Sequence, residues 1–324
     1  MSRLLSGMRP TGKMHLGHYF GVLKNWVYLQ DKYQSFFMIA DLHALTDCPK
    51  FENLNPIIED IVITWLSAGI DPSKATIFRQ SDIKEHCELE TLLSMIAKIS
   101  DLKRIPSYKE ADKKIKNKTG FFLYSLLQAA DILLYKASVV PVGEDQVPHI
   151  EYARVLAKII NKIAEKEILP LPQPLLTKAK RVPGIDGKAK MSKSLNNVIE
   201  IEKTNFDSLW QIFPKLQTDP KRITKNDPGN PKDCPIIFPY AQLVMDANEL
   251  KEIKYNCQNA KWGCLDCKKK VAEKISSFFE PIREKQKVLR KKKGLYIEIL
   301  QKGKKEAQKE AQNTISLIKP IFGL

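Results

Sequence analysis

Residues 3–18 read RLLSGMRPTGKMHLGH. Residues 3–6 (RLLS) predict a short β-strand, residues 7–12 predict a loop, and a helix is expected to begin near Leu16. The free N–H groups and the positive dipole end of such a helix attract phosphate. A strand that leads through a glycine-bearing loop into a helix is typical of a parallel sheet with helices on its faces. This stretch therefore predicts an α/β fold with an anion site at the end of its first strand.

The same alternation recurs through the first half of the chain. Further strands are expected at 35–40, 75–79 and 138–142, and helices at 55–68, 89–99, 121–135 and 151–163. Ligands of parallel sheets bind beyond the carboxyl ends of the strands. Polar clusters stand at three of these ends, at 7–18, 41–43 and 143–146. We therefore expect the three clusters to converge on one site.

The pattern changes after Leu169, where PLPQP (170–174) predicts a stiff boundary. A basic loop with two glycines follows at 177–194, and helical patterns are found at 205–213, 239–253, 268–293 and 295–318. The expected fold class is therefore α/β, with a Rossmann-like parallel-sheet domain and a C-terminal helical domain. The expected boundaries are 1–175 for the sheet domain, 176–204 for a mobile loop and linker, and 205–324 for the helical domain. We expect the last helix to pack back on the sheet domain.

Composition excludes several classes of protein. Of the 324 residues, 43% are hydrophobic and 28% charged, as in folded globular chains. No uncharged apolar run reaches the roughly 18 residues of a membrane span. The N-terminal sequence MSRLLSGMRP lacks the apolar core of a signal peptide. We therefore expect a cytoplasmic protein without a membrane segment.

The net charge of +16 favours a polyanionic partner. From Lys268 onward the chain has 16 basic and 6 acidic residues, so this part carries most of the excess. The functional interpretation is contact with a nucleic-acid backbone. The alternative is a solvated, lysine-rich surface.

Two motifs have residues suited to phosphate. In HLGH, His15 and His18 can donate hydrogen bonds to a phosphoryl group, and Gly17 lets a base or ribose approach the backbone. In KMSKS (190–194), two lysines on a loop can reach a β- or γ-phosphate. The alternatives are a turn with two surface histidines and an exposed basic loop.

The third motif is GEDQVPHIE, residues 143–151. It follows a predicted strand, so Gly143, Glu144 and Asp145 can meet a ribose and Gln146 a polar group of a substrate. The alternative is a helix N-terminus with acidic residues in its first turn.

Four cysteines are clustered as Cys234-x22-Cys257-x6-Cys264-x2-Cys267. Four thiolates can hold zinc or a [4Fe–4S] cluster. Structural zinc sites more often show two short-spaced pairs, and here only Cys264 and Cys267 are close. The alternative is four buried cysteines without a metal.

The ordered motifs, with ADLHALT (40–46) and AADILLY (129–135), closely resemble a class I aminoacyl-tRNA synthetase, and within that class tryptophanyl-tRNA synthetase. This resemblance implies activation of L-tryptophan by ATP with Mg²⁺, followed by transfer to tRNA(Trp), in a homodimer. The cysteine spacing resembles the iron–sulfur branch of these enzymes, which implies a [4Fe–4S] cluster, with zinc as the alternative.

The resemblance also implies roles for individual residues. The catalytic residues would be His15, His18, Lys190 and Lys193. ATP would contact Arg9, Pro10, Thr11, Gly17, His18, Gly143, Glu144, Asp145, Val182, Lys190, Met191, Ser192, Lys193 and Ser194. Tryptophan would contact Gly7, His43, Tyr124, Gln128, Asp131 and Gln146. Cys234, Cys257, Cys264 and Cys267 would hold the metal in a helical domain that binds the tRNA anticodon.

Asp131 would accept the indole N–H. Phenylalanine and tyrosine have no ring N–H, and a buried carboxylate without its donor is costly. Gln128 departs from several members of the family, which have Met there, and tyrosyl enzymes use a glutamine in a comparable stretch. The alternatives are therefore a tyrosyl-tRNA synthetase, a non-catalytic iron–sulfur RNA-binding protein on the same scaffold, or a nucleotidyltransferase.

Overall fold

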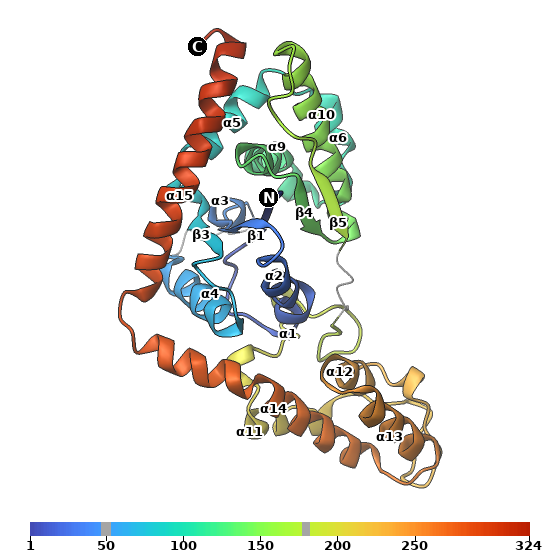
Figure 1. Ribbon diagram of the computed structural model, residues 1–324. Coiled ribbons are helices and arrows are strands. Elements are labelled where there is room, and N and C mark those ends of the chain that lie inside the picture. The colour runs from blue at the N-terminus through green and yellow to red at the C-terminus, as the bar shows by residue number, and fades with distance from the viewer. Residues whose placement is uncertain (47–52, 177–181) are drawn as a thin grey trace.

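The computed structural model describes residues 1–46, 53–176 and 182–324 (Figure 1). A parallel five-stranded sheet has the order β3-β2-β1-β4-β5. The strands are β1 (Arg3–Met8), β2 (Gln34–Ile39), β3 (Ala75–Arg79), β4 (Val139–Val142) and β5 (Gln173–Leu176). The sequence pattern predicted the first four, whereas β5 arises where only a boundary was expected. Pro174 is tolerated because β5 is an edge strand, where one N–H is dispensable.

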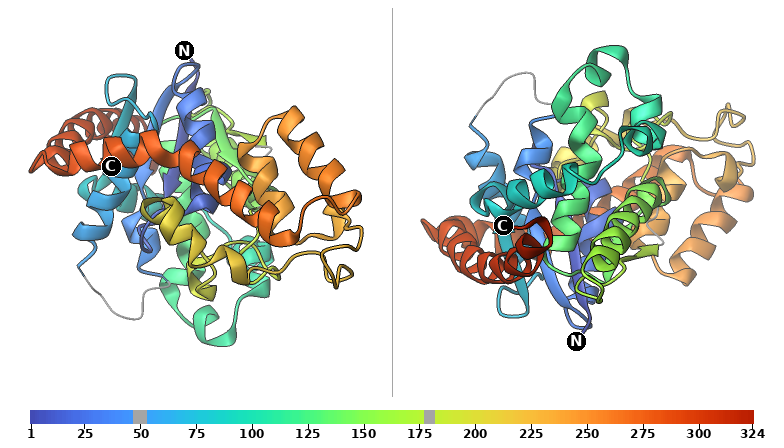
Figure 2. Two further views of the ribbon diagram at one scale, coloured as in Figure 1. Left: turned by 90° about the horizontal axis from the view of Figure 1, so that it is seen from below. Right: turned by 90° about the horizontal axis from the view of Figure 1, so that it is seen from above.

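Helices flank both faces of this sheet (Figures 1 and 2). In the first part of the chain they are α1 (Leu16–His18), α2 (Lys24–Leu29), α3 (Asp41–Ala44), α4 (Asn55–Ala68), α5 (Glu85–Ser94), α6 (Ile99–Arg104), α7 (Pro106–Glu110), α8 (Lys113–Lys116), α9 (Thr119–Leu134) and α10 (Val147–Ile163). The predicted α/β class is confirmed. The single helix expected at 89–99 is wrong, because α5 ends at Ser94 and α6 begins only at Ile99.

The two faces of the sheet belong to two hydrophobic cores, because successive strand residues point to opposite sides. Leu4 and Phe37 pack with α2 and α4, and the Trp26 ring stacks on Phe37 at a centroid distance of 4.5 Å. Leu5 and Phe36 instead pack with α5, α9 and α10. Both faces are therefore covered, as the continuous apolar strands predicted.

The second part of the chain is helical. It contains α11 (Phe206–Trp210), α12 (Ile237–Val244), α13 (Ala247–Gln258), α14 (Cys264–Arg290) and α15 (Leu295–Ile318). The one helix expected at 239–253 is two, because Asp246 accepts hydrogen bonds from Asn248 N and Glu249 N and so begins a new helix.

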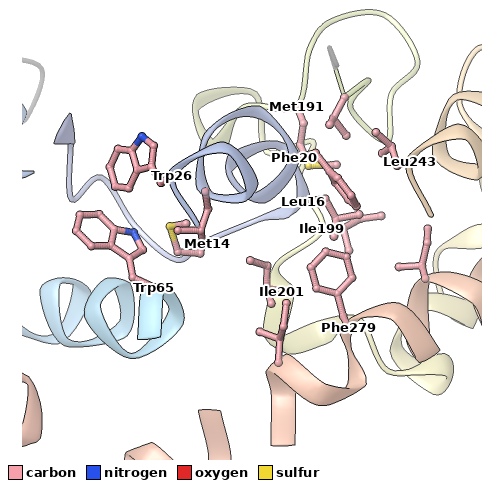
Figure 3. Packing of buried hydrophobic residues seen from close by; sticks show 14 of the residues in the cluster. Met14, Leu16, Phe20, Trp26, Trp65, Met191, Ile199, Ile201, Leu243 and Phe279 are labelled. Atoms are coloured by element: carbon pink, nitrogen blue, oxygen red, sulfur yellow. The ribbon is translucent and has the colours of Figure 1, made fainter. Parts of the chain in front are cut away.

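The core under α2 and α4 continues into this second part. Figure 3 shows Leu16 and Phe20 packed with Met191 and Ile199 on one side and with Phe279 of α14 on the other. The rings of Phe20 and Phe279 meet edge to face at 5.8 Å. The segment after β1, the segment around Met191 and α14 therefore share one hydrophobic core.

Helix α15 returns to the sheet and lies along the edge strand β3 (Figure 1). Gly303 makes the approach possible, because a Cβ on it would stand 1.8 Å from the Ile77 carbonyl oxygen. Thr76 Oγ1 donates to Glu306 Oε2 at 3.0 Å, and Arg3 pairs with Glu310 at 2.8 Å. The last long helix thus covers an edge that would otherwise be open.

Within the described part of the chain, no helix is both long enough and apolar enough to cross a lipid bilayer.

Gly303→Ala should lower the free energy of unfolding by about 1–3 kcal/mol, because the added methyl forces α15 away from β3. Urea unfolding with linear extrapolation measures the change. Gly120→Ala is the matched control: its Cβ would meet no atom within 4 Å, and alanine inside α9 should add about 0.5–1 kcal/mol. Equal stability of the Gly303→Ala and wild-type proteins would contradict the close contact.

Candidate active site

The candidate site lies where the strand order reverses. The chain proceeds from β1 outward to β3 on one side and from β4 to β5 on the other, so β1 and β4 are neighbours whose connections diverge. HLGH follows β1, and the 3₁₀ turn Glu144–Gln146 follows β4. In open parallel sheets this switch point is where ligands bind. The polar cluster at 41–43 follows β2 at the same end of the sheet.

The two histidines of HLGH are packed against each other. His15 is 3% exposed, and its ring stacks on that of His18 at a centroid distance of 3.7 Å. Burial, followed by the charge of Lys193, lowers the pKa of His15 to about 4. Burial and the charges of His15 and Lys193 also hold the pKa of His18 well below its ordinary value. Both rings are therefore neutral at pH 7.

The orientation of His18 follows from its partner. The His15 backbone N–H donates to His18 Nδ1 at 3.4 Å. Because a neutral imidazole carries one proton, Nε2 of His18 is the donor nitrogen. A neutral donor at a helix N-terminus suits an oxyanion without needing a charge of its own.

The segment that follows KMSKS is joined to the start of the HLGH segment by backbone hydrogen bonds. Leu16 N donates to Ile199 O at 3.0 Å, and Ile201 N donates to Met14 O at 2.9 Å. Gly17 allows this contact, because a Cβ there would lie 2.9 Å from the His15 ring and 3.4 Å from Met191. The two motifs, far apart in the sequence, are thus neighbours in the structure.

Two residues that no motif predicted shape this loop. Asn197 is buried, accepts from Ser192 N at 2.7 Å, and donates to Asp186 Oδ2 at 3.0 Å. Gly184 makes room for it, because a Cβ there would lie 2.1 Å from Asn197 Nδ2. Asn197 and Asp186 carry no motif signal, since they act on the backbone of the loop rather than on a ligand.

Lys193 lies across the loop that follows β1. A Cβ on Gly12 would be 3.3 Å from Lys193 Nζ, and Gly12 has φ +131°, which favours glycine. Burial lowers the pKa of Lys193 to about 8, although Asp60 and Glu200 act in the opposite direction. Its ammonium is therefore close to the backbone that a phosphate would contact.

The other predicted nucleotide residues differ in exposure. Val182 and Met191 belong to the hydrophobic core and are joined by a Met191 N to Val182 O bond of 2.9 Å. Pro10 is buried, whereas the exposed members of the set are Arg9, Thr11, Gly143, Glu144, Asp145 and Lys190. The side chain of Ser194 and residues 177–181 lie outside what the structure describes.

Asp131 of α9 is at the centre of a buried polar cluster. Its Oδ1 accepts from His86 Nδ1 at 2.6 Å, and its Oδ2 accepts from His43 Nε2 at 2.8 Å. Gln80 Nε2 donates to both oxygens, at 2.9 and 3.0 Å. Burial raises the pKa of Asp131, but the charge of His86 and the hydrogen bonds from His43 and His86 outweigh it and hold the pKa at about 2.

One face of α9 carries the residues expected to bind an amino acid. Tyr124, Gln128 and Asp131 are spaced four and three residues apart and so share that face. The Tyr124 ring meets His43 at 4.5 Å and His149 at 5.9 Å, both edge to face. His149 is a buried residue that the sequence analysis did not select.

A chain of amide contacts links this face to the turn after β4. Gln146 Nε2 donates to Asp145 Oδ2 at 2.9 Å, and Gln128 Nε2 donates to Gln146 Oε1 at 3.4 Å. The carboxylate of Asp145 therefore fixes the orientation of both amides. The structure thus brings the residues expected to bind ATP and those expected to bind tryptophan into direct contact.

The four clustered cysteines line one pocket that is partly open to solvent, with Arg222 and Trp262 on its wall. Cys257 lies on α13, and Cys264 and Cys267 lie in the first turn of α14, away from the sheet (Figure 1). Burial, with a contribution from the other cysteines, raises the pKa of Cys267 to about 12.

Among the residues that the structure describes, no group of three or more His, Cys, Asp or Glu side chains is arranged to hold a metal ion. The predicted ligands therefore share a pocket without converging on a single point.

Comparison with known proteins adds independent findings. The family model of tRNA synthetases class I (W and Y) matches residues 1–280. The chain is 40% identical over 328 residues to a tryptophan–tRNA ligase of Thermotoga maritima, covering 99% of each chain. It is 40% identical over 327 residues to that of Fusobacterium nucleatum, covering 100% of this chain and 98% of the other.

A crystal structure of tryptophanyl-tRNA synthetase from Campylobacter jejuni complexed with ADP and tryptophan is similar in fold. It superposes with a TM-score of 0.87 at 37% identity and covers 99% of this chain and 100% of that chain.

The affinity for ATP should fall as the pH rises through about 8, because Lys193 loses its proton there and with it the attraction for phosphate. The loss should reach roughly tenfold, the size of one hydrogen bond to a charged group. Calorimetric titration at pH values on either side of about 8 measures it. Lys193→Arg keeps its charge at high pH and should lose this dependence. Identical pH profiles for the two proteins would assign the effect to another group.

Proposed function

The chain belongs to the class I tRNA synthetases of the W and Y group. We propose the roles that the residues of its site play in the ligation of tryptophan to tRNA. The enzyme activates L-tryptophan with ATP to tryptophanyl-adenylate, releases pyrophosphate, and then transfers tryptophan to tRNA(Trp) with release of AMP. The observation that carries this function is the full-length identity of 40% with a tryptophan–tRNA ligase. The tyrosine alternative is thereby disfavoured.

We propose that the phosphates of ATP with Mg²⁺ bind between HLGH and KMSKS. The neutral His15 and His18 would donate hydrogen bonds to the phosphates, and Lys190 and Lys193 would add positive charge as pyrophosphate leaves. This arrangement stabilises charge that grows in the transition state, and no protein nucleophile is needed. The contacts between the two motif segments and the position of Lys193 beside Gly12 support it.

The remaining nucleotide contacts would surround these groups. Arg9, Pro10, Thr11 and Gly17 would follow the phosphates along the loop after β1, with Met191, Ser192 and Ser194 on the other side. Gly143, Glu144, Asp145 and Val182 would meet the adenosine. The position of both segments at the switch point of the sheet supports this assignment.

Tryptophan would bind along the exposed side of the α9 face. Its ammonium would meet Tyr124 and Gln146, and its indole would lie near Gly7, His43, Gln128 and Asp131. The buried charge of Asp131 supports a site that distinguishes polar from apolar rings. The amide contacts from Asp145 to Gln128 support a common site for both substrates.

We propose that Cys234, Cys257, Cys264 and Cys267 hold a [4Fe–4S] cluster, with zinc as the alternative. Four cysteines on one pocket are the ligand set of such a cluster, in which each thiolate binds a different iron. When bound, the cluster would cross-link α13, α14 and the segment before α12.

The proposed division of labour follows the chain. Residues 1–175 would bind ATP and tryptophan, the segment up to residue 204 would link the two parts, and 205–324 would contact the anticodon part of tRNA. The excess of positive charge after Lys268 supports tRNA contact. We further propose a homodimer in the cytoplasm, where free thiols such as the exposed Cys87 persist.

Asp131→Asn should raise the KM for tryptophan by about tenfold while the KM for ATP changes little, because one of its three donors loses its acceptor. Tryptophan-dependent ATP–pyrophosphate exchange measures both constants. Tyrosine serves as the control and should drive no exchange. An unchanged KM would remove Asp131 from the pocket, and exchange with tyrosine would revive the tyrosyl alternative.

Protein purified without oxygen should be brown and contain about four irons and four sulfides per chain. Cys264→Ser should lower the Tm and aminoacylation but leave pyrophosphate exchange nearly unchanged, because the cysteines lie away from the sheet. Cys87→Ser is the matched control, because Cys87 is an exposed cysteine outside the pocket. This substitution should change neither the Tm nor aminoacylation. Colourless protein with one zinc per chain would replace the cluster by zinc.

A further inference from the structure

The carboxylate of Asp131 is held on both oxygens by buried side chains. It makes four contacts of 2.6–3.0 Å, two on each oxygen, from His43, His86 and Gln80. Asp131 is 2% exposed, so water does not compete for these contacts. The conformation of this side chain is therefore set by the protein before any substrate binds.

His86 is held at both of its ring nitrogens. Its Nδ1 contacts Asp131 Oδ1 at 2.6 Å, and its Nε2 contacts the Tyr135 hydroxyl at 2.8 Å. His86 and Tyr135 are both 0% exposed. With a partner on each nitrogen, the imidazole cannot rotate about its χ2 angle without losing two buried hydrogen bonds.

Tyr135 is in turn anchored in the sheet. Its ring stacks on Phe36 of β2 at 4.9 Å and contacts Phe78 of β3 at 5.1 Å. The ring of His86 also lies beside Phe78, at 6.1 Å. A connected series of contacts therefore runs from β2 and β3 through Tyr135 and His86 to the carboxylate of Asp131.

The other oxygen of Asp131 faces residues of the proposed tryptophan pocket. His43 contacts Oδ2 and packs edge to face against Tyr124, at 4.5 Å. These are two of the residues proposed to surround tryptophan. His86 itself is separated from them by Asp131. An effect of His86 on tryptophan must therefore pass through the position of that carboxylate.

We propose that His86 is a positioning residue for tryptophan: it holds Asp131, and through Asp131 the imidazole of His43, in the arrangement that binds the substrate. This inference rests on the proposed tryptophan pocket. It also accounts for the burial of five polar side chains at the sheet, which is costly unless each is held by a partner.

The test compares His86→Leu with His86→Asn in tryptophan-dependent pyrophosphate exchange. Leucine fills much of the space but removes both hydrogen bonds, so the KM for tryptophan should rise by about tenfold while the KM for ATP stays near the wild-type value. The amide nitrogen of asparagine stands where imidazole has Nδ1, so His86→Asn should restore most of the affinity for tryptophan.

Two further variants keep the test decisive. Tyr135→Phe removes only the hydroxyl behind His86 and should raise the same KM by a smaller factor, which covers the case in which His86→Leu does not fold. Gly303→Ala destabilises the protein at α15 and should leave both KM values unchanged, which separates lost stability from lost positioning.

The outcomes separate this inference from the proposed function. A raised KM in Asp131→Asn and in His86→Leu, with recovery in His86→Asn, supports both. If Asp131→Asn raises the KM but His86→Leu does not, or if asparagine and leucine are equally harmful, His86 is not a positioning residue. If none of the variants changes the KM for tryptophan, the pocket itself is misplaced and the proposed binding site is overturned.

Discussion

The backbone pairing of residues 14–16 with residues 199–201 is the contact on which the rest of this structure depends. Two hydrogen bonds join the segments, and beneath them Leu16 and Ile199 enter the same hydrophobic core. The pairing places KMSKS beside the first loop of the sheet. Because Phe279 of α14 packs into that core as well, the helical part is positioned by the same contact (Figure 3). The groups proposed to bind phosphate and the helical part proposed to contact tRNA are therefore positioned by the same contact.

Charge in this site is set mainly by burial. On the side proposed to bind phosphate, removal from water keeps His15 and His18 neutral and lowers the pKa of Lys193 to about 8. On the side proposed to bind tryptophan, the hydrogen-bond donors around Asp131 keep its carboxylate charged in spite of burial. The same end of the sheet thus carries a region suited to bind an anion and a region that contains the buried carboxylate of Asp131.

The hydrophobic periodicity of the sequence predicted correctly the helices and strands that are decided by one apolar face or run. The expected ranges of α4, β3 and α15 agree with the structure residue for residue, because one apolar face or run decides each of them. The strand ends also located HLGH and GEDQ correctly. Features that depend on partners distant in the sequence were missed. Strand β5, which contains Pro174, forms only by pairing with β4. The hydrogen bond between Asn197 and Asp186 in the KMSKS loop has no local sequence pattern. His86 and Gln80 were missed for the same reason, since only the fold brings them to Asp131.

The cover of β3 by α15 orders events during synthesis. A ribosome makes β3 early, but the helix that contacts it follows only with residues 295–318. Until then the sheet has an unprotected edge, with backbone groups free to pair with another chain. A nascent polypeptide interrupted before this helix would keep that edge and become a substrate for chaperones and proteases. Translation through α15 therefore marks the moment at which the catalytic half is safe from aggregation.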